Sequence, residues 1–228
     1  MLTLIVFHPI QFISLHLFGH EAHKKSADLM SYFLVQGLRV LGTRITFEGV
    51  DNLPCDRPLI IISNHQSLFD IPPVVLAFRK HHPKFISKIE LGKGIPSVSY
   101  NLKHSGAALI DRKNQKQSIR EIFKLGKLIQ EKNYAACIYP EGTRSRNGKV
   151  RRFKEAGVAT LLRAAPSALI VPFVIDGNWK IQCYGKYPLG LGVKVKYTIL
   201  DPIEPKGYKP EELVEHVQQV IKDSLHQG

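Results

Sequence analysis

The chain of 228 residues is long enough for one domain with a hydrophobic core, alone or with a short appendage, and too short for two domains of ordinary size. Hydrophobic residues make up 44% of the chain and charged residues 22%, a balance that excludes an intrinsically disordered protein. The net charge of +13 at pH 7 predicts an anionic partner, either nucleic acid, an acidic membrane surface or a phosphorylated substrate.

The N-terminal region differs in composition from the rest of the chain. Its first 18 residues carry no charged side chain, but Pro9 and several polar residues interrupt the apolar series, so this stretch is too short and too polar for a transmembrane helix. It also lacks the positively charged start of a signal peptide. A second apolar series at helical spacing runs from Met30 to Leu41, after a polar joint at residues 20–25. We therefore predict that residues 1–42 form an apolar two-helix hairpin that lies in a membrane interface; for the second helix, packing on the domain core is the alternative.

From residue 43 to residue 228 the pattern is that of a single α/β domain. Short apolar runs rich in Ile and Val alternate with longer stretches of helical periodicity, which predicts a mostly parallel or mixed sheet of about seven strands flanked by helices. The predicted strands are Ile45–Gly49, Leu59–Ser63, Lys84–Lys88, Ala107–Asp111, Tyr134–Tyr139, Leu169–Ile175 and Val193–Leu200. The predicted helices are Pro72–Lys80, Gln115–Glu131, Phe153–Ala164 and Pro210–Ser224.

The first candidate site follows the second predicted strand, in the segment Asn64–Asp70. On a continuous helix His65 and Asp70 would point about 140° apart, so they can meet only across a turn from strand to helix. There the carboxylate would fix the tautomer of the imidazole and leave its other nitrogen as a general base for a hydroxyl group. The alternative is structural, because Ser67 and Asp70 also fit a variant of the capping box.

The second candidate site is the segment Tyr139–Ser145, again directly after an apolar strand. Gly142 lets the backbone approach a ligand closely, and the planar guanidinium of Arg144 suits a phosphate group. Six positive charges and no acid lie between Arg144 and Lys154, which indicates a phosphate site, although a charge run is often only a solvated surface. A third strand delivers Arg112 to its end.

These segments, in this order, resemble the glycerophospholipid acyltransferase family that bacterial 1-acyl-glycerol-3-phosphate acyltransferases typify. The NHxxxxD motif matches at Asn64–Asp70 and the PEGTRS motif at Pro140–Ser145. A GxxFIxR motif matches at Gly106–Arg112, with Leu109 in place of the usual Phe. Weaker matches are the Val-Pro pair at Val171 and Pro172, a KxEL segment at Lys88–Leu91 and an FKxG segment at Phe153–Lys154 with Gly157.

The resemblance implies an O-acyltransferase that moves a fatty acyl group from acyl-CoA or acyl carrier protein to the sn-2 hydroxyl of lysophosphatidic acid, giving phosphatidic acid, at the cytoplasmic face of a membrane and without a bound cofactor or metal. It implies that His65 is the base and Asp70 its partner. The residues that it implies for substrate binding are Arg112, Glu141, Gly142, Thr143, Arg144, Lys88 and Lys154. Glu141 and Thr143 would shape the loop, because a free carboxylate facing a phosphate would repel it.

Two other functions remain open from the sequence. A related acyltransferase could use glycerol-3-phosphate, a lyso-ornithine lipid or another lysophospholipid as acceptor. A basic nonenzymatic lipid- or nucleic-acid-binding protein would explain the net charge but not the paired His65 and Asp70, and the aromatic residues are not interleaved with the basic cluster as base stacking requires. Metal chemistry is not expected, because the His20–His23 segment is one residue short of HExxH. We also expect the cysteines, Cys55, Cys137 and Cys183, to be reduced, because they are widely spaced.

Overall fold

The sheet organises the fold. The structure is a computed structural model that describes residues 1–49, 53–185 and 187–227, and within these residues seven strands form one mixed sheet in the order β1-β7-β6-β2-β5-β3-β4. The strands are β1 (Arg44–Glu48), β2 (Leu59–Ser63), β3 (Lys84–Lys88), β4 (Ala108–Ile110), β5 (Ala135–Ile138), β6 (Leu169–Asp176) and β7 (Lys194–Ile199). Strands β2 to β6 run parallel to one another, β7 is antiparallel to β6, and β1 is parallel to β7. The predicted α/β class and the seven predicted strands are confirmed.

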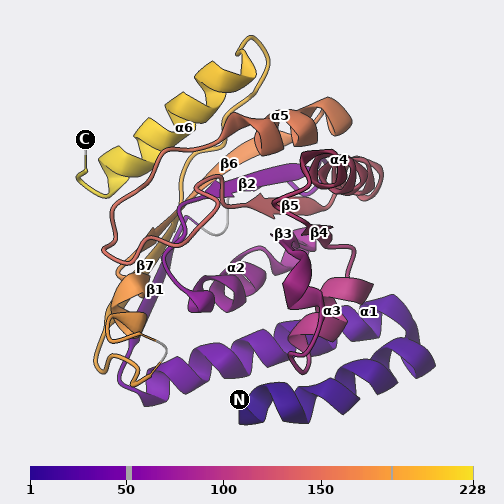
Figure 1. The fold of residues 1–228 in the computed structure, drawn as a ribbon, viewed down its shortest axis with the longest axis vertical. Helices are drawn as coiled ribbons and strands as arrows, with labels where there is room; N and C mark the ends of the chain where they lie inside the picture. Colours follow the sequence, from indigo (N-terminus) through magenta and orange to yellow (C-terminus); the bar gives the residue numbers. More distant parts are fainter. Residues whose placement is uncertain (50–52, 186, 228) are drawn as a thin grey trace.

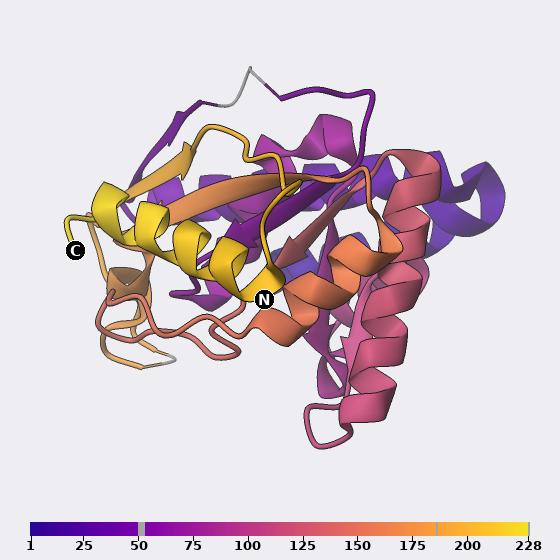
Figure 2. The ribbon, with the colours of Figure 1, turned by 90° about the horizontal axis from the view of Figure 1, so that it is seen from above.

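Helices cover both faces of this sheet. They are α1 (Leu2–Val40), α2 (Ile71–Ala77), α3 (Val98–His104), α4 (Gln115–Lys132), α5 (Glu155–Ala164) and α6 (Pro210–Ser224). Four short 3-10 helices are η1 (Leu68–Asp70), η2 (Arg79–His81), η3 (Ile89–Gly92) and η4 (Asn178–Gln182). Helices α4, α5 and α6 lie side by side over one face, while α1, α2 and α3 lie on the other side (Figures 1 and 2). The flanking helices predicted from the sequence are confirmed, and α3 is an addition to them.

The core has two halves because β2 is buried on both of its faces. Ile60 and Ile62 pack beneath α4, α5 and α6, whereas Leu59 and Ile61 pack toward α1 and α2. Successive side chains of a strand point to opposite faces, so a strand between two helix layers is apolar at every position. This is why the central strands were visible in the sequence as unbroken apolar runs.

The N-terminal helix α1 is a hairpin of two arms. Gly19 has φ +79° and ψ −172°, a backbone conformation that is nearly restricted to glycine, and the chain reverses direction there. The arms lie side by side (Figure 1), with the rings of Phe7 and Phe33 5.8 Å apart and the amide of Gln11 3.6 Å from the sulfur of Met30. The predicted hairpin is thus present, with its bend at Gly19 rather than within residues 20–25.

The hairpin is exposed on its outer side. Taken over its whole length, α1 is long and apolar enough to cross a membrane, which was not expected of residues 1–18 alone. The reversal at Gly19, however, leaves a first arm of only about 25 Å. A bilayer core is about 30 Å thick. The large apolar side chains exposed on the hairpin are Met1, Leu2, Ile5, Val6, Ile10, Phe12, Ile13, Leu17, Phe18, Leu29, Tyr32, Phe33 and Val40.

The inner side of the hairpin packs on α2 and α3. The hydroxyl of Ser97, just before α3, donates to the backbone oxygen of Leu4 at 2.6 Å, and its backbone N–H donates to Nδ1 of His8 at 3.1 Å. These bonds fix the first arm to the α/β domain.

Candidate active site

The candidate site lies at one edge of the sheet, where five parallel strands end. His65 follows β2, Lys88 ends β3, Arg112 follows β4, Arg144 follows β5 and Asn178 follows β6. In open parallel sheets ligands bind outside the carboxyl ends of the strands. The strand order therefore brings to one edge residues that are far apart in the chain.

His65 and Asp70 form a hydrogen-bonded pair across a tight turn. Nδ1 of His65 lies 2.6 Å from Oδ2 of Asp70, and the Asp70 side chain is completely buried, while the side chain of His65 keeps 19% of its surface exposed. With Nδ1 engaged by the carboxylate, Nε2 is left to act on a substrate, the arrangement that a general base requires.

The capping alternative is present in the same turn. Oγ of Ser67 accepts from the backbone N–H of Phe69 at 3.2 Å, and Asp70 accepts from the backbone N–H of Ser67 at 3.0 Å. This capping box starts η1. The structural role and the pairing with His65 therefore coexist, because the carboxylate holds the turn with the same oxygen that it offers to the imidazole.

The Asp70 carboxylate is fully satisfied by donors. Oδ2 also accepts from the backbone N–H of Gln66 at 2.7 Å, and Oδ1 accepts from the side-chain amide of Asn178. These hydrogen bonds satisfy both oxygens of a buried carboxylate. They hold the Asp70 side chain in one orientation behind the imidazole.

Tyr139 packs against one face of the His65 imidazole. Its ring stacks on that of His65, with centroids 4.3 Å apart and planes inclined by 23°. Burial raises the pKa of the Tyr139 hydroxyl well above its ordinary value, so that group stays protonated. Tyr139 is the residue directly after β5, and no role was predicted for it from the sequence.

Glu141 joins the loops that follow β2 and β5. Its side chain is buried, and its two carboxylate oxygens accept from the backbone N–H groups of His65 at 2.9 Å and Arg151 at 3.4 Å. Ser145 completes the connection by donating its backbone N–H to the carbonyl of His65 at 2.7 Å. Burial raises the pKa of Glu141 to about 7, although both N–H groups oppose that shift. Through these hydrogen bonds Glu141 fixes the conformation of the loop after β5 relative to the turn that carries His65.

Four of the predicted substrate-binding residues lie on this loop or beside it: Gly142, Thr143, Arg144 and Lys154. Gly142 has φ +71°, and a β-carbon there would lie 3.9 Å from the ammonium of Lys154, so this cation is beside the loop. Arg144 is half-buried and donates to Oε1 of Gln182 at 3.4 Å. Thr143 is exposed on the same loop.

Lys88 and Arg112 are exposed at the ends of the two strands farthest from His65 on that side of the sheet. Lys88 pairs with Ile110, the last residue of β4, and Arg112 lies two residues beyond Ile110. Burial lowers the pKa of the Arg112 guanidinium, and the nearby Glu90 carboxylate raises it. Strand order places both residues at the edge of the site, and among the described residues no hydrogen bond or ion pair joins either of them to His65 or Arg144.

Asn64, the first residue of the NHxxxxD match, has a structural role. Its side chain is buried, donates to the carbonyl of Ile175 at 2.8 Å and accepts from the N–H of the same residue at 2.8 Å. It thereby continues the pairing of β2 with β6 beyond the last strand residue of β2 and fixes the start of the turn that carries His65.

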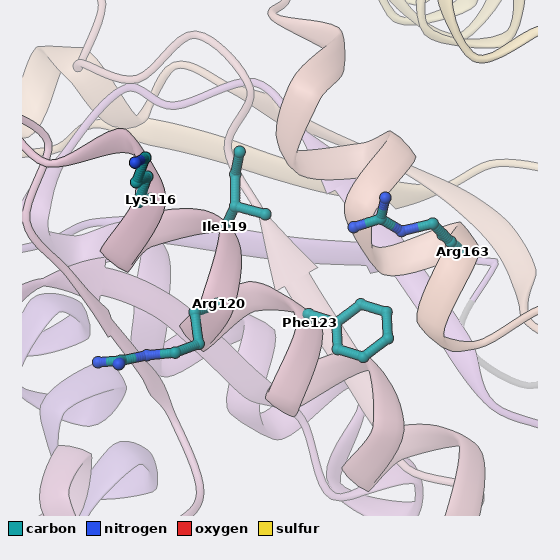
Figure 3. Close-up of a pocket in the computed structure, with 5 residues that line it drawn as sticks. All are labelled: Lys116, Ile119, Arg120, Phe123 and Arg163. Carbon is teal, nitrogen blue, oxygen red and sulfur yellow. The ribbon is translucent and has the colours of Figure 1, made fainter.

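A separate cavity of about 490 Å³ lies outside the site, between α4 and α5. Figure 3 shows Ile119 and Phe123 on α4, with Arg163 reaching toward Phe123 from α5. Lys116 and Arg120 complete its lining. The guanidinium carbon of Arg163 lies 5.4 Å from the centre of the Phe123 ring, within the range of a cation–π contact. The cavity is thus apolar at its floor and positively charged at its rim.

The fold and the paired His65 and Asp70 define an α/β protein with a hydrogen-bonded His–Asp pair at the carboxyl edge of its sheet. Residues 44–176 match the family model described as Acyltransferase, and the chain belongs to this family. A 1-acyl-sn-glycerol-3-phosphate acyltransferase of Helicobacter pylori is 30% identical over 81% of this chain and 77% of its own length. The resemblance predicted from the motifs is confirmed.

Other relatives are longer. The chloroplastic 1-acyl-sn-glycerol-3-phosphate acyltransferase LPAT1 of Arabidopsis thaliana is 30% identical over 80% of this chain, but the match covers 49% of that protein. The chain thus spans about half the length of this plant relative.

The crystal structure of the 1-acyl-sn-glycerophosphate acyltransferase PlsC from Thermotoga maritima superposes with a TM-score of 0.76 at 28% identity, covering 99% of this chain and 94% of that one.

Proposed function

We propose that this protein transfers a fatty acyl group from a thioester donor to the free sn-2 hydroxyl of 1-acyl-glycerol-3-phosphate, forming phosphatidic acid. The observation that carries the proposal is the 2.6 Å bond between His65 and the buried Asp70 at the edge where Arg144 also lies. The names of the relatives from Helicobacter pylori and Thermotoga maritima support the same acceptor.

The reaction proceeds by direct transfer. Nε2 of His65 takes the proton from the acceptor hydroxyl while the alkoxide oxygen attacks the thioester carbonyl, so that an ester C–O bond forms and the C–S bond breaks. The imidazolium then returns the proton to the leaving thiolate. Asp70 stabilises the imidazolium, because its carboxylate is hydrogen-bonded to Nδ1. No group of the protein becomes acylated in this scheme.

The acceptor phosphate binds to the basic residues of the edge. Arg144 is the main ligand, since its planar guanidinium can donate two parallel hydrogen bonds to a phosphate. Lys154 stands beside Gly142 in the same loop, and Lys88 and Arg112 supply further positive charge from β3 and β4. Glu141, Gly142 and Thr143 shape the loop around the phosphate, with Glu141 turned inward.

The donor is acyl-CoA or acyl carrier protein, and both are anionic. The net charge of +13 attracts either one, and the three cations at the rim of the cavity between α4 and α5 add to that attraction. The exposed apolar side chains of α1 enter one leaflet of a membrane without crossing it, at the cytoplasmic face where thioester donors are available. An enzyme docked there draws the acceptor from the bilayer and returns its product to it.

The test is acyl transfer in mixed micelles. Purified protein receives a radiolabelled acyl thioester and, in separate reactions, lysophosphatidate, glycerol-3-phosphate, a lyso-ornithine lipid or lysophosphatidylcholine. We expect phosphatidate as the main product. Transfer to another acceptor at a higher kcat/KM would contradict the proposed acceptor, and labelled lipid bound without transfer to any acceptor would contradict the enzymatic function.

A further inference from the structure

The 3-10 helix η4 folds back over the turn that carries His65. It begins after Gly177, whose φ is +77° and where a β-carbon would lie 2.3 Å from the backbone oxygen of Lys194. Only glycine fits this close approach of two backbones. From the sequence, the predicted strand in this part of the chain ends at Ile175, and no role was predicted for the residues of η4.

Asn178 supplies the donor for the second oxygen of Asp70. Both side chains are completely buried. Three donors meet at Oδ2 of Asp70, from His65, Gln66 and Ser67, whereas Oδ1 accepts from the side-chain amide of Asn178. Without this amide, one oxygen of a buried carboxylate would lose its hydrogen bond, which costs free energy and leaves the plane of the carboxylate less firmly fixed.

Gln182, at the other end of η4, contacts both halves of the site. Its Oε1 accepts from the hydroxyl of Ser67 at 2.9 Å, from the backbone N–H of Leu68 at 3.0 Å and from the guanidinium of Arg144 at 3.4 Å. One side-chain oxygen thus links the turn between His65 and Asp70 to the arginine of the loop after β5.

We propose that η4 is a positioning element for the reaction, an inference that rests on the proposed function. Asn178 fixes the carboxylate of Asp70 and, through it, the imidazole of His65. Gln182 sets the guanidinium of Arg144 relative to that imidazole. Neither residue touches the reacting atoms, so both are positioning residues.

The two residues predict different kinetic effects. Asn178→Ala lowers kcat by about 10- to 100-fold with little change in the acceptor KM, since the chemistry depends on the His65 geometry. The acid limb of the pH profile of kcat/KM moves to higher pH, because a carboxylate with one donor fewer attracts the imidazolium more strongly. Gln182→Leu raises the acceptor KM by about 5- to 20-fold with a smaller effect on kcat, since it acts through Arg144.

The experiment compares wild type, Asn178→Ala, Asn178→Ser, Gln182→Leu, His65→Ala and the control Gln130→Ala in the mixed-micelle assay, with thermal unfolding of each variant. Gln130 bonds to Ser167 near the opposite edge of the sheet, so its loss removes side-chain hydrogen bonds without touching the site. A serine at position 178 retains a donor, and we expect it to recover part of the kcat lost in the alanine variant.

The proposal is overturned if folded Asn178→Ala has wild-type kcat and an unchanged pH profile, or if its loss of kcat equals that of Gln130→Ala. It is also overturned if neither variant at position 178 folds, because Asn178 would then have a purely structural role. Inactive wild type would instead contradict the proposed function. Active His65→Ala would contradict the assigned base, so the two failures are distinguishable.

Discussion

The carboxylate of Glu141 accepts a hydrogen bond from the backbone N–H of His65, 2.9 Å away, although 76 residues separate the two. This bond joins the turn that presents the proposed base to the loop that presents the proposed phosphate ligand. The two motifs therefore form one structural unit, so a change in the conformation of one loop alters the conformation of the other.

Glu141 makes the stability of the protein depend on pH. Its pKa is raised from 4.5 to about 7 by burial, so the folded state binds this proton more tightly than the unfolded state. The contribution of Glu141 to the free energy of unfolding therefore decreases as the pH rises through this window. In Glu141→Gln this dependence is absent.

Urea unfolding of both proteins at about pH 5 and about pH 8 measures the effect. We expect the free energy of unfolding of wild type, relative to Glu141→Gln, to be lower at the higher pH by about 2 kcal/mol. A difference that stays constant or increases with pH would show that Glu141 is ionised in the folded protein throughout.

Asp70→Asn removes the charge behind the imidazole with almost no change in volume. We expect kcat to fall by about 10³-fold or more, because the imidazolium formed during proton transfer loses its stabilising partner. The change in kcat at saturating substrates, with thermal unfolding as a check on the fold, measures this role. A folded variant that keeps kcat within about threefold of wild type would assign Asp70 to the capping box alone.

Arg144→Ala tests the phosphate site. In the proposed mechanism Arg144 binds the acceptor in the ground state and the transition state alike, so we expect the KM for lysophosphatidate to rise by about 10- to 100-fold and kcat to change little. Arg57→Ala is the matched control, because Arg57 pairs with Glu204 before the start of β2, at the opposite edge of the sheet. Equal KM values for the two variants would contradict the assignment.

The hairpin prediction concerns binding to vesicles. Leu17 and Phe18 are 72% and 71% exposed at the bend of α1, and we expect Leu17→Glu with Phe18→Glu to weaken binding to anionic phospholipid vesicles by about 10-fold or more. Tyr208→Glu, on the side of α6, is the control and should bind as wild type does. Unchanged binding of the double variant in a flotation assay would exclude this part of the hairpin as the contact.

The central strands β2, β5 and β6 could be predicted from the sequence because they are buried on both faces. Runs such as Leu59–Ile62 have no polar alternation, and the turns around them are marked by glycine, proline or polar residues. Helix α3 was missed because Val98–His104 is only seven residues long and contains four polar positions and three apolar or aromatic ones. A helix this short shows no clear periodicity.

The sequence also indicated His65, Asp70 and Arg144 as site residues, since each follows an apolar strand within a dense local motif. Tyr139, Asn178 and Gln182 were not assigned, although they contact the same turn. Asn178 reaches Asp70 across 108 positions, and Gln182 reaches Ser67 across 115. Such contacts depend on the order of β6, β2 and β5 in the sheet, which the local pattern of one sequence does not specify.

The measurement that tests the central claim most directly is acyl transfer to lysophosphatidate by wild type and by His65→Ala, with thermal unfolding of both. We expect phosphatidate from wild type and a rate at least about 10³-fold lower from a folded His65→Ala variant. Phosphatidate formed by the variant at a rate close to that of wild type would contradict His65 as the base, and with it the mechanism derived from this site.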